Sequence, residues 1–241
     1  RAKGTPILGI CGGFQMLRKG FAPKTSARGI FFSDPYSGDK IEMTPERLAS
    51  IYETLKPDVA MTLDDVVPYG APKERYAEAI KKTHAWAAEG VRLKSNHGRL
   101  LFGIFQGGTF PDLRVESAKA IAALDVDGIA IGGLCIGEPK EKMKEAIRVS
   151  IPHCPADKPR YLMGVGSPLD IVHCVKMGVD VFDSIYPTSL ARHGTIFSWE
   201  GKLDMTKSSW KNNHQPLVDE CQCSVCAKHT RSYISHLTRT H

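Results

Sequence analysis

Short apolar runs recur along the chain, and each is too short to form a buried helix. Most are flanked by glycine or aspartate, a pattern typical of strands in a sheet that is covered on both faces. The runs lie at residues 7–10, 59–63, 101–105, 128–131, 161–165 and 179–182. They restrict the chain to folds that place a sheet in the interior.

Helix-length amphipathic stretches separate these runs. Thr44 followed by Pro45 is a helix-start signal for a segment that ends near Leu55. The other stretches cover residues 73–89, 113–124, 140–150 and 168–177. Strands and helices that alternate at this spacing indicate parallel βα units, as found in α/β barrels and in doubly wound sheets.

The residues that follow the strands favour the barrel. Nearly every predicted strand ends in glycine or a polar residue, and barrel enzymes place their chemistry at the carboxyl ends of their strands. A doubly wound sheet would gather such residues at one switch point. We therefore predict an α/β fold of the TIM-type (β/α)8 barrel class. Because six strands are visible, the barrel is expected to be incomplete, lacking about two βα units at its N-terminus.

The sequence pattern changes after residue 197. Residues 204–216 are polar and loop-like, a cysteine cluster follows, and the chain ends within a predicted helix. We predict two domains, a partial barrel with the catalytic site at residues 1–197 and a shortened zinc-binding subdomain at residues 198–241.

Bulk properties add weaker constraints. The net charge is +6, from 32 Lys and Arg against 26 Asp and Glu. Such a charge is compatible with a polyanionic partner but does not require one. No apolar run approaches the roughly 20 residues that span a bilayer, and no signal peptide begins the chain. We expect a cytoplasmic protein without a membrane segment.

The cysteine cluster is the strongest local signal. Cys221, Cys223 and Cys226 crowd into six residues, whereas the other four of the seven cysteines are scattered. Thiolates at this spacing converge on a tetrahedral Zn²⁺ ion with little chain distortion, so we predict a structural zinc site. The fourth ligand stays open, and the nearby histidines are His229, His236 and His241.

Three strand ends carry candidate chemistry, each with a purely structural alternative. Asp183 suits a nucleophile or a general base, but an aspartate there also caps a turn. Asp64 suits recognition of a purine N–H edge, but it also suits helix capping. Gln106 and the Gly132–Gly133 pair offer an amide and bare backbone, although tight turns use glycine as well.

Several motifs together resemble one family. In order and spacing they are similar to those of the tRNA-guanine transglycosylase (queuine tRNA-ribosyltransferase) family, from about Gly12 to the end of the chain. The motifs are Gly12-Gly-Phe-Gln15, Gln106-Gly-Gly108, Gly132-Gly-Leu-Cys-Ile-Gly-Glu138, Tyr161-Leu-Met-Gly-Val-Gly166, Phe182-Asp-Ser-Ile-Tyr-Pro-Thr188 and Cys221-Gln-Cys-Ser-Val-Cys226.

The resemblance implies exchange of guanine in tRNA for a 7-deazaguanine, preQ1 or queuine, through a ribosyl intermediate on Asp183. Asp64 would bind the N1 and exocyclic amine edge of the base, and Gln106 and the Gly133 N–H its O6. The remaining residues implied at the base are Phe14 and Met163 on its two faces, Gly132, and Leu134 with Glu138 at the 7-substituent.

The same resemblance implies two RNA-binding stretches and a homodimer. The RNA would lie against Gly164, Val165, Gly166, Ser167, Pro168, Leu169 and Asp170, and against Thr188, Ser189, Leu190, Ala191 and Arg192. The family's fourth zinc ligand, a histidine, would lie beyond the end of this chain.

The chain departs from the family pattern near its start. The family places Asp-Ser before Gly-Gly-Phe-Gln, and the aspartate is a general acid/base, but Ile10 and Cys11 stand here. Residues 6–17 also resemble the nucleophile turn of class I glutamine amidotransferases, yet no downstream His-x-Glu element appears. Thr188 lacks the Arg-Asn expected soon after it. A slow or inactive enzyme is therefore expected.

Two rival hypotheses stay open. A non-catalytic RNA-binding homologue or partner subunit would explain Ile10, whereas retention of Asp183, Asp64 and Gln106 argues against it. A related enzyme that acts on DNA would share the same base pocket.

Overall fold

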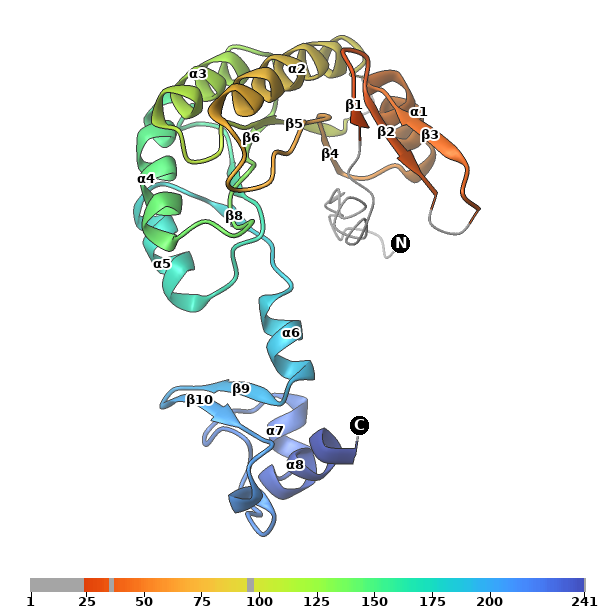
Figure 1. Ribbon diagram of the computed structural model, residues 1–241. Coiled ribbons are helices and arrows are strands. Elements are labelled where there is room, and N and C mark those ends of the chain that lie inside the picture. Colours follow the sequence, from red (N-terminus) through yellow and green to blue (C-terminus); the bar gives the residue numbers. More distant parts are fainter. Residues whose placement is uncertain (1–23, 35–36, 95–97, 241) are drawn as a thin grey trace. The chain divides into compact units, whose positions relative to one another are not determined.

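The computed structural model describes residues 24–34, 37–94 and 98–240. The chain divides into two compact units, residues 1–183 and residues 184–241. This division falls earlier than the boundary placed after residue 197 from the sequence. The reason is that α6 (Tyr186–Arg192) packs on β9 (Thr195–Ser198), which pairs with β10 (Gly201–Asp204) (Figure 1). In the described part of the chain, no helix is long and apolar enough to cross a membrane.

The first unit is built on a curved parallel sheet. Its five strands pair in the order β4-β5-β6-β7-β8, and helices cover its convex face (Figure 1). This is the curled half of a barrel, an α/β arrangement consistent with an incomplete TIM-type barrel. The strands are β4 (Val59–Met61), β5 (Leu100–Phe105), β6 (Gly128–Ile131), β7 (Arg160–Leu162) and β8 (Val181–Phe182).

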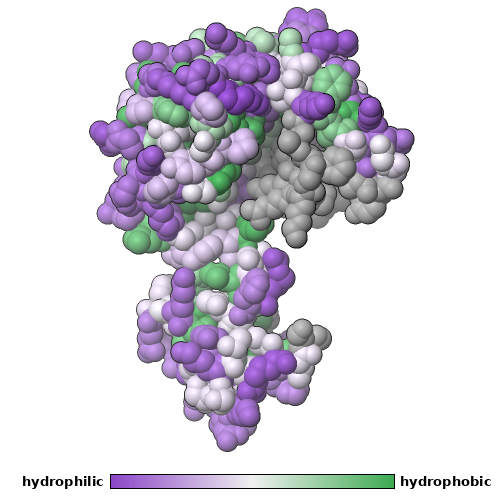
Figure 2. All heavy atoms as spheres, in the orientation of Figure 1, coloured by the Kyte–Doolittle hydropathy of each residue, from purple (hydrophilic) through white to green (hydrophobic). Residues whose placement is uncertain are grey.

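The covering helices lie close to the ranges expected from the sequence. They are α1 (Pro45–Leu55), α2 (Lys73–Arg92), α3 (Pro111–Ala122), α4 (Lys140–Ser150) and α5 (Pro168–Lys176), and a short 3-10 turn (Ile151–His153) follows α4. Thr44 caps α1 as predicted, since its side chain accepts the Arg47 N–H. The solvent side of these helices is mostly hydrophilic (Figure 2).

Each face of the sheet has its own apolar cluster. Residues on the convex face, such as Phe105, Ile131 and Leu162, pack against α3, α4 and α5 in the largest core cluster. Residues of opposite parity on the same strands, such as Ile104 and Tyr161, form a second cluster on the concave face. A strand places alternate side chains on opposite faces. The two clusters therefore indicate on which face of the sheet the first residue after each strand lies.

A small antiparallel sheet precedes α1 and was not predicted from the sequence. It contains β1 (Lys24–Thr25), β2 (Ile30–Ser33) and β3 (Lys40–Met43), in that order. Ile30 packs with Leu63 and Trp86, and the Trp86 indole donates to the Ala27 carbonyl at 2.9 Å. These contacts tie the sheet to α2. Its strands lack a long apolar run, so periodicity alone did not reveal them.

Within the described residues β4 is an edge strand of the parallel sheet. The outward backbone groups of Met61 are both satisfied by one side chain of α1. The Tyr52 hydroxyl donates to the Met61 carbonyl at 2.9 Å and accepts the Met61 N–H at 3.2 Å. A side chain thus occupies the place of a neighbouring strand at this point.

The second unit combines a hairpin with short helices. It contains α6 (Tyr186–Arg192), β9 (Thr195–Ser198), β10 (Gly201–Asp204), a 3-10 turn (Ser208–Trp210), α7 (Ser224–Lys228) and α8 (Arg231–Thr240). β9 and β10 pair antiparallel, with Phe197 opposite Lys202. Met205 and Leu217 are its buried apolar residues.

Candidate active site and metal centre

Residues proposed from the sequence follow five consecutive strands of the parallel sheet. Asp64 comes after β4, Gln106 directly after β5 and Gly132 directly after β6. Met163 and Asp183 follow β7 and β8. The register aligns Phe105 with Ile131, Ile131 with Leu162, and Leu162 with Phe182, so the next residue of each strand lies at the same level. The last residues of β5 to β8 pack on the convex face, so the residues that directly follow them lie on the concave face.

The residues after β4, β5 and β6 are in direct contact. The Gln106 side-chain amide donates to Asp64 Oδ2 at 2.6 Å. A Cβ atom on Gly132 would lie 2.5 Å from Gln106 Nε2, and one on Gly133 would lie 2.1 Å from Gln106 Oε1. Gly133 also has a φ of +68°. A side chain at either position would displace the Gln106 amide, so bare backbone lies against it.

The two neighbouring aspartates have different surroundings. Asp65 is 2% exposed and is bound by Arg75 at 2.6 Å and by the Thr25 hydroxyl at 3.1 Å. Asp64 bonds the Gln106 amide instead. The pKa of Asp64 is raised to about 6. Burial of the carboxyl group is the main cause and the charge of Asp65 adds to it, whereas the hydrogen bond from Gln106 acts in the opposite direction. Asp65 is thus held in a buried ion pair, whereas Asp64 is half-buried and its described side-chain partner is the neutral Gln106 amide.

Asp183 is held through one of its two oxygens. Its Oδ1 accepts the Tyr161 hydroxyl at 2.7 Å and the Gly164 N–H at 3.0 Å. Tyr161 is fully buried, and burial together with the bond to Asp183 raises the pKa of this phenol well above its ordinary value. The hydroxyl therefore stays protonated and donates. Asp183 Oδ2 receives no hydrogen bond from any described residue.

The loop after β6 is braced by Glu138. Its carboxylate accepts the N–H groups of Cys135 and of Ile136, the latter at 3.0 Å. Cys135 has a φ of +62°, and Leu134 is buried beneath the loop. Glu138 thereby fixes the backbone around Leu134. On the next strand, Met163 packs against the concave-face cluster.

The stretch after β7 is partly structural. Ser167 caps α5, accepting the Asp170 N–H at 3.3 Å and donating to Asp170 Oδ2 at 2.6 Å. Lys140 reaches the same carboxylate at 2.6 Å. Burial would raise the pKa of Asp170, but the bonds from Lys140 and Ser167 bring it below its ordinary value. Gly164, Pro168 and Leu169 are exposed, whereas Val165 is buried.

The other RNA-binding candidates lie on α6, in the second unit. Thr188, Ala191 and Arg192 are exposed there, while Ser189 and Leu190 are half-buried. The Thr188 hydroxyl donates to the Ile185 carbonyl at 3.0 Å, which anchors the first turn of α6.

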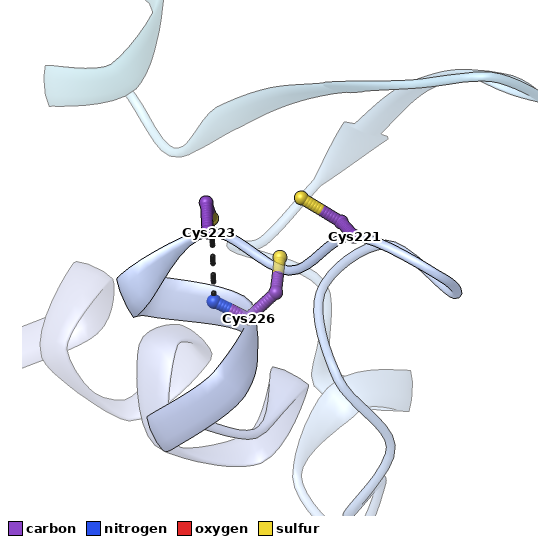
Figure 3. A group of neighbouring side chains, drawn as sticks. All are labelled: Cys221, Cys223 and Cys226. Carbon is purple, nitrogen blue, oxygen red and sulfur yellow. Dashed lines mark hydrogen bonds between the residues drawn. The ribbon is translucent and has the colours of Figure 1, made fainter.

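The three clustered cysteines converge in the second unit. Cys221 lies in a loop, and Cys223 and Cys226 lie at the beginning of α7 (Figure 3). Their sulfur atoms all lie within 4.8 Å of one another, so the cluster could hold a metal ion. Hydrogen bonds, first that from the Cys226 backbone, lower the pKa of Cys223 to about 7, which favours the thiolate that a metal requires.

No histidine or carboxylate joins the three sulfur atoms at this spacing among the described residues. His229 stacks instead on Tyr233, with ring centroids 5.0 Å apart. Three candidates from the sequence, Ile10, Cys11 and Phe14, lie outside the described residues, as does His241.

Sequence reasoning missed three supporting side chains. These are Tyr161, which bonds Asp183, and Arg114 and Ser117 of α3, which bond backbone groups of the strand ends. The strand pattern assigns Tyr161 to a core, and nothing in it points to a partner across the sheet. Arg114 is a charged residue on a predicted amphipathic helix, where a solvated position is the ordinary expectation.

Comparison with known proteins identifies the family. The family model described as Queuine tRNA-ribosyltransferase matches residues 2–241. The chain belongs to this family. Among queuine tRNA-ribosyltransferases, it is 42% identical to that of Thiobacillus denitrificans over 234 residues, which is 97% of this chain and 64% of the relative. The Desulforamulus reducens protein is 42% identical over 235 residues, covering 98% and 64% of the two chains.

A third relative, from a Synechococcus strain, is also 42% identical over 98% of this chain and 63% of its own length. The chain thus spans somewhat less than two thirds of the curated queuine tRNA-ribosyltransferases that it matches. The family match and the strand-end residues concern the same stretch of sequence.

Proposed function

We propose that the chain exchanges guanine in tRNA for a 7-deazaguanine, preQ1 or queuine, with Asp183 as the covalent nucleophile. One observation carries the proposal. Asp64, Gln106 and the Gly132–Gly133 pair lie in contact at one edge of the sheet, and Asp183 ends a strand at the same edge. Base recognition and a nucleophile for the sugar are thus combined. The names of the relatives support the same reaction.

The chemistry consists of two displacements. Asp183 Oδ2 attacks C1′ of the target guanosine, the C1′–N9 bond breaks, and its electron pair leaves with guanine. The incoming base then attacks C1′ through N9 and loses a proton, and the bond to Asp183 breaks. Two inversions retain the configuration of the sugar. The bonds to Oδ1 support this role, because they orient the carboxylate, while no described residue donates a hydrogen bond to Oδ2.

Recognition of the base is assigned to the neighbouring strand ends. Ionised Asp64 accepts the N1 and exocyclic amine protons, while Gln106 and the Gly133 N–H donate to O6. Met163 lies on one face of the ring, and Phe14 is assigned to the other. The backbone at Leu134, braced by Glu138, meets the 7-substituent.

The RNA around the extruded nucleotide is assigned to residues 164–170 and 188–192. In the first stretch, Gly164, Pro168 and Leu169 offer exposed surface, whereas Asp170 acts through the cap of α5. In the second, Arg192 is exposed and suits a phosphate.

The cysteine cluster is assigned to structural zinc, with Cys221, Cys223 and Cys226 as ligands. Bound zinc would link the loop before α7 to its first turn, and it supplies no step of the exchange. A homodimer is proposed on the family resemblance alone.

A trapping experiment tests the function. The chain is incubated with labelled tRNA and quenched in denaturant, and the expected result is a denaturation-resistant adduct that Asp183→Asn lacks. Asp180→Asn is the matched control, since Asp180 precedes the same strand and bonds the Arg160 N–H at 2.9 Å. An adduct that survives Asp183→Asn, or one that Asp180→Asn also removes, would contradict the assignment.

A second candidate function is a non-catalytic RNA-binding subunit. Ile10 favours it, because isoleucine cannot transfer a proton at the position where the family places its acid. This candidate predicts binding of tRNA in a gel-shift assay without any adduct in the trapping experiment.

A further inference from the structure

Arg114 is a buried cation directly behind the strand ends. It lies on α3, is 0% exposed, and its guanidinium carbon is 4.4 Å from the centroid of the Phe105 ring. Its Nη1 donates to the Gly132 carbonyl at 2.7 Å. Nε and Nη2 have no hydrogen-bond partner, and no carboxylate forms an ion pair with Arg114 among the described residues.

Burying such a charge is costly, so its retention calls for an explanation. Desolvation lowers the pKa of Arg114 to about 9, which still leaves the group mostly protonated at neutral pH. A methionine or leucine would fill the same volume without the cost. The bond to Gly132 is the feature that these side chains would not reproduce.

The bonded carbonyl shares a peptide unit with the Gly133 N–H. The described chain has no cis peptide, so the carbonyl and the N–H of this unit point in opposite directions. Because the Gly132 oxygen faces Arg114, the Gly133 N–H points away from α3. It donates to no group in the described part of the chain. Gln106 lies against the same two glycines.

We infer that Arg114 is a positioning residue that polarises the Gly132–Gly133 peptide and makes the Gly133 N–H a stronger donor to O6 of the departing base. The inference rests on the proposed function. When the C1′–N9 bond breaks, the electron pair enters the purine and part of its charge reaches O6. A fixed donor in a dry site stabilises that charge, and a cation on the carbonyl strengthens the donor. Arg114 itself transfers no proton.

A second side chain of α3 marks the contrast. Ser117, one turn after Arg114, accepts the Gln106 backbone N–H at 3.1 Å and contacts His84 Nε2 at 2.9 Å. It braces the peptide between Phe105 and Gln106. Only Arg114, among the described residues, bonds the peptide that carries the Gly133 N–H.

Calorimetric titration with free bases tests the inference. Guanine and 6-thioguanine are compared, because the thio analogue keeps the edge that faces Asp64 but replaces O6 by sulfur, a weak acceptor. We expect Arg114→Met to weaken guanine binding about tenfold and 6-thioguanine binding less than about threefold. Lys119→Met, which removes a charge from the exposed side of α3, is the control and should change neither.

The outcomes separate polarisation from packing. Equal weakening of both bases, or no weakening of guanine, would overturn the inference. If Arg114→Met does not fold, Arg114→Lys, which keeps the charge, serves instead; a smaller loss that is again specific to guanine supports the inference. Failure of the unmodified chain to bind either base would remove the proposed function itself, and the inference with it.

Discussion

The Tyr161 hydroxyl donates a 2.7 Å hydrogen bond to Asp183 Oδ1 across two neighbouring parallel strands. Tyr161 belongs to β7 and lies in the concave-face cluster, so its ring cannot move without disturbing that core. The bond therefore transmits the rigidity of the core to the carboxylate. A carboxylate positioned in this way, the nucleophile of the proposed function, would be preorganised before a substrate arrives.

Tyr161→Phe is expected to slow exchange without weakening tRNA binding. The ring still fills the core, but Asp183 loses a charge-assisted hydrogen bond, and we expect kcat to fall about tenfold with KM for tRNA unchanged. Steady-state guanine exchange measures both. Tyr76→Phe is the control, since Tyr76 is also buried but donates to the Pro68 carbonyl. An equal loss in both variants would indicate a general effect of losing a buried hydroxyl.

Asp64→Asn and Asp65→Asn should change stability in opposite directions at pH 7.5. The pKa of Asp64 is about 6 in the folded chain against an ordinary 3.8, so the unfolded chain binds fewer protons between these values. The free energy of unfolding therefore falls as the pH rises through this window. Asp64→Asn removes the cost of ionising a buried carboxyl group. It should stabilise the protein by about 1 to 3 kcal/mol above pH 6, with little effect below pH 4.

Asp65→Asn breaks the buried pair with Arg75 and should destabilise the protein by roughly 2 kcal/mol or more. Urea unfolding at pH 4 and pH 7.5 measures both variants. Destabilisation by Asp64→Asn at pH 7.5 would contradict the assignment of Asp64 as a carboxylate held for a ligand.

Base affinity should rise with pH through the same transition. The Asp64 carboxylate must be ionised to accept the N1 and amine protons of guanine, and burial raises its pKa to about 6. Guanine should therefore bind about tenfold more tightly at pH 7 than at pH 5. Titrations at these pH values test this, and Asp64→Asn should bind weakly with no such dependence. A pH dependence that survives the substitution belongs to another group.

Metal content should depend on the cysteine cluster. We expect purified protein to bind zinc, and Cys223→Ser or Cys226→Ser to lower the affinity at least about tenfold, because each removes one of three converging thiolates. Competition with a chelating dye measures the affinity, and Co²⁺ substitution reports the number of thiolates by charge-transfer absorption. Cys135→Ser is the control, because Cys135 lies outside the cluster. Equal losses in the control would refute the ligand set.

Ile10→Asp should raise the exchange rate in a chain of the relatives' full length. General acid–base catalysis is typically worth about 10² to 10⁴ in rate, and isoleucine provides none. We expect the unmodified chain to exchange guanine slowly and Ile10→Asp alone to recover little. The same substitution in a chain that spans the full length of the relatives should gain about 10²-fold or more. Ile10→Asn is the control, because asparagine is polar but transfers no proton. A gain with Asp but not with Asn would come from proton transfer rather than from a polar side chain. Robust exchange by the unmodified chain would show that another group replaces the missing acid.

The parallel sheet and its helices were predictable because buried strands and amphipathic helices have distinct periods. The strand-end residues were predictable for a related reason, since Gln106 and Asp183 directly follow apolar runs that the pattern delimits. The antiparallel sheet at residues 24–43 was not, because only Ile30 of its β2 strand is deeply buried. Partly exposed short strands give no strong periodic signal.

The contacts between side chains could not be predicted from the sequence, for a different reason. Asp64 and Asp65 are adjacent and identical in type, and only their surroundings show that one is paired with Arg75 and the other with Gln106. The bond of Arg114 to Gly132 joins α3 to the end of β6, the next strand in the chain. Such contacts depend on tertiary packing, to which one-dimensional patterns are insensitive.

The hydroxyl of Tyr52 on the Met61 backbone has a consequence for self-association. An open sheet edge is a template onto which a foreign strand can add, and such addition is a common route to aggregation. At Met61 an incoming strand would first have to displace a side chain that already satisfies both backbone groups. Tyr52→Phe would leave the Met61 N–H and carbonyl open to such a strand while the aromatic ring on α1 stays in place.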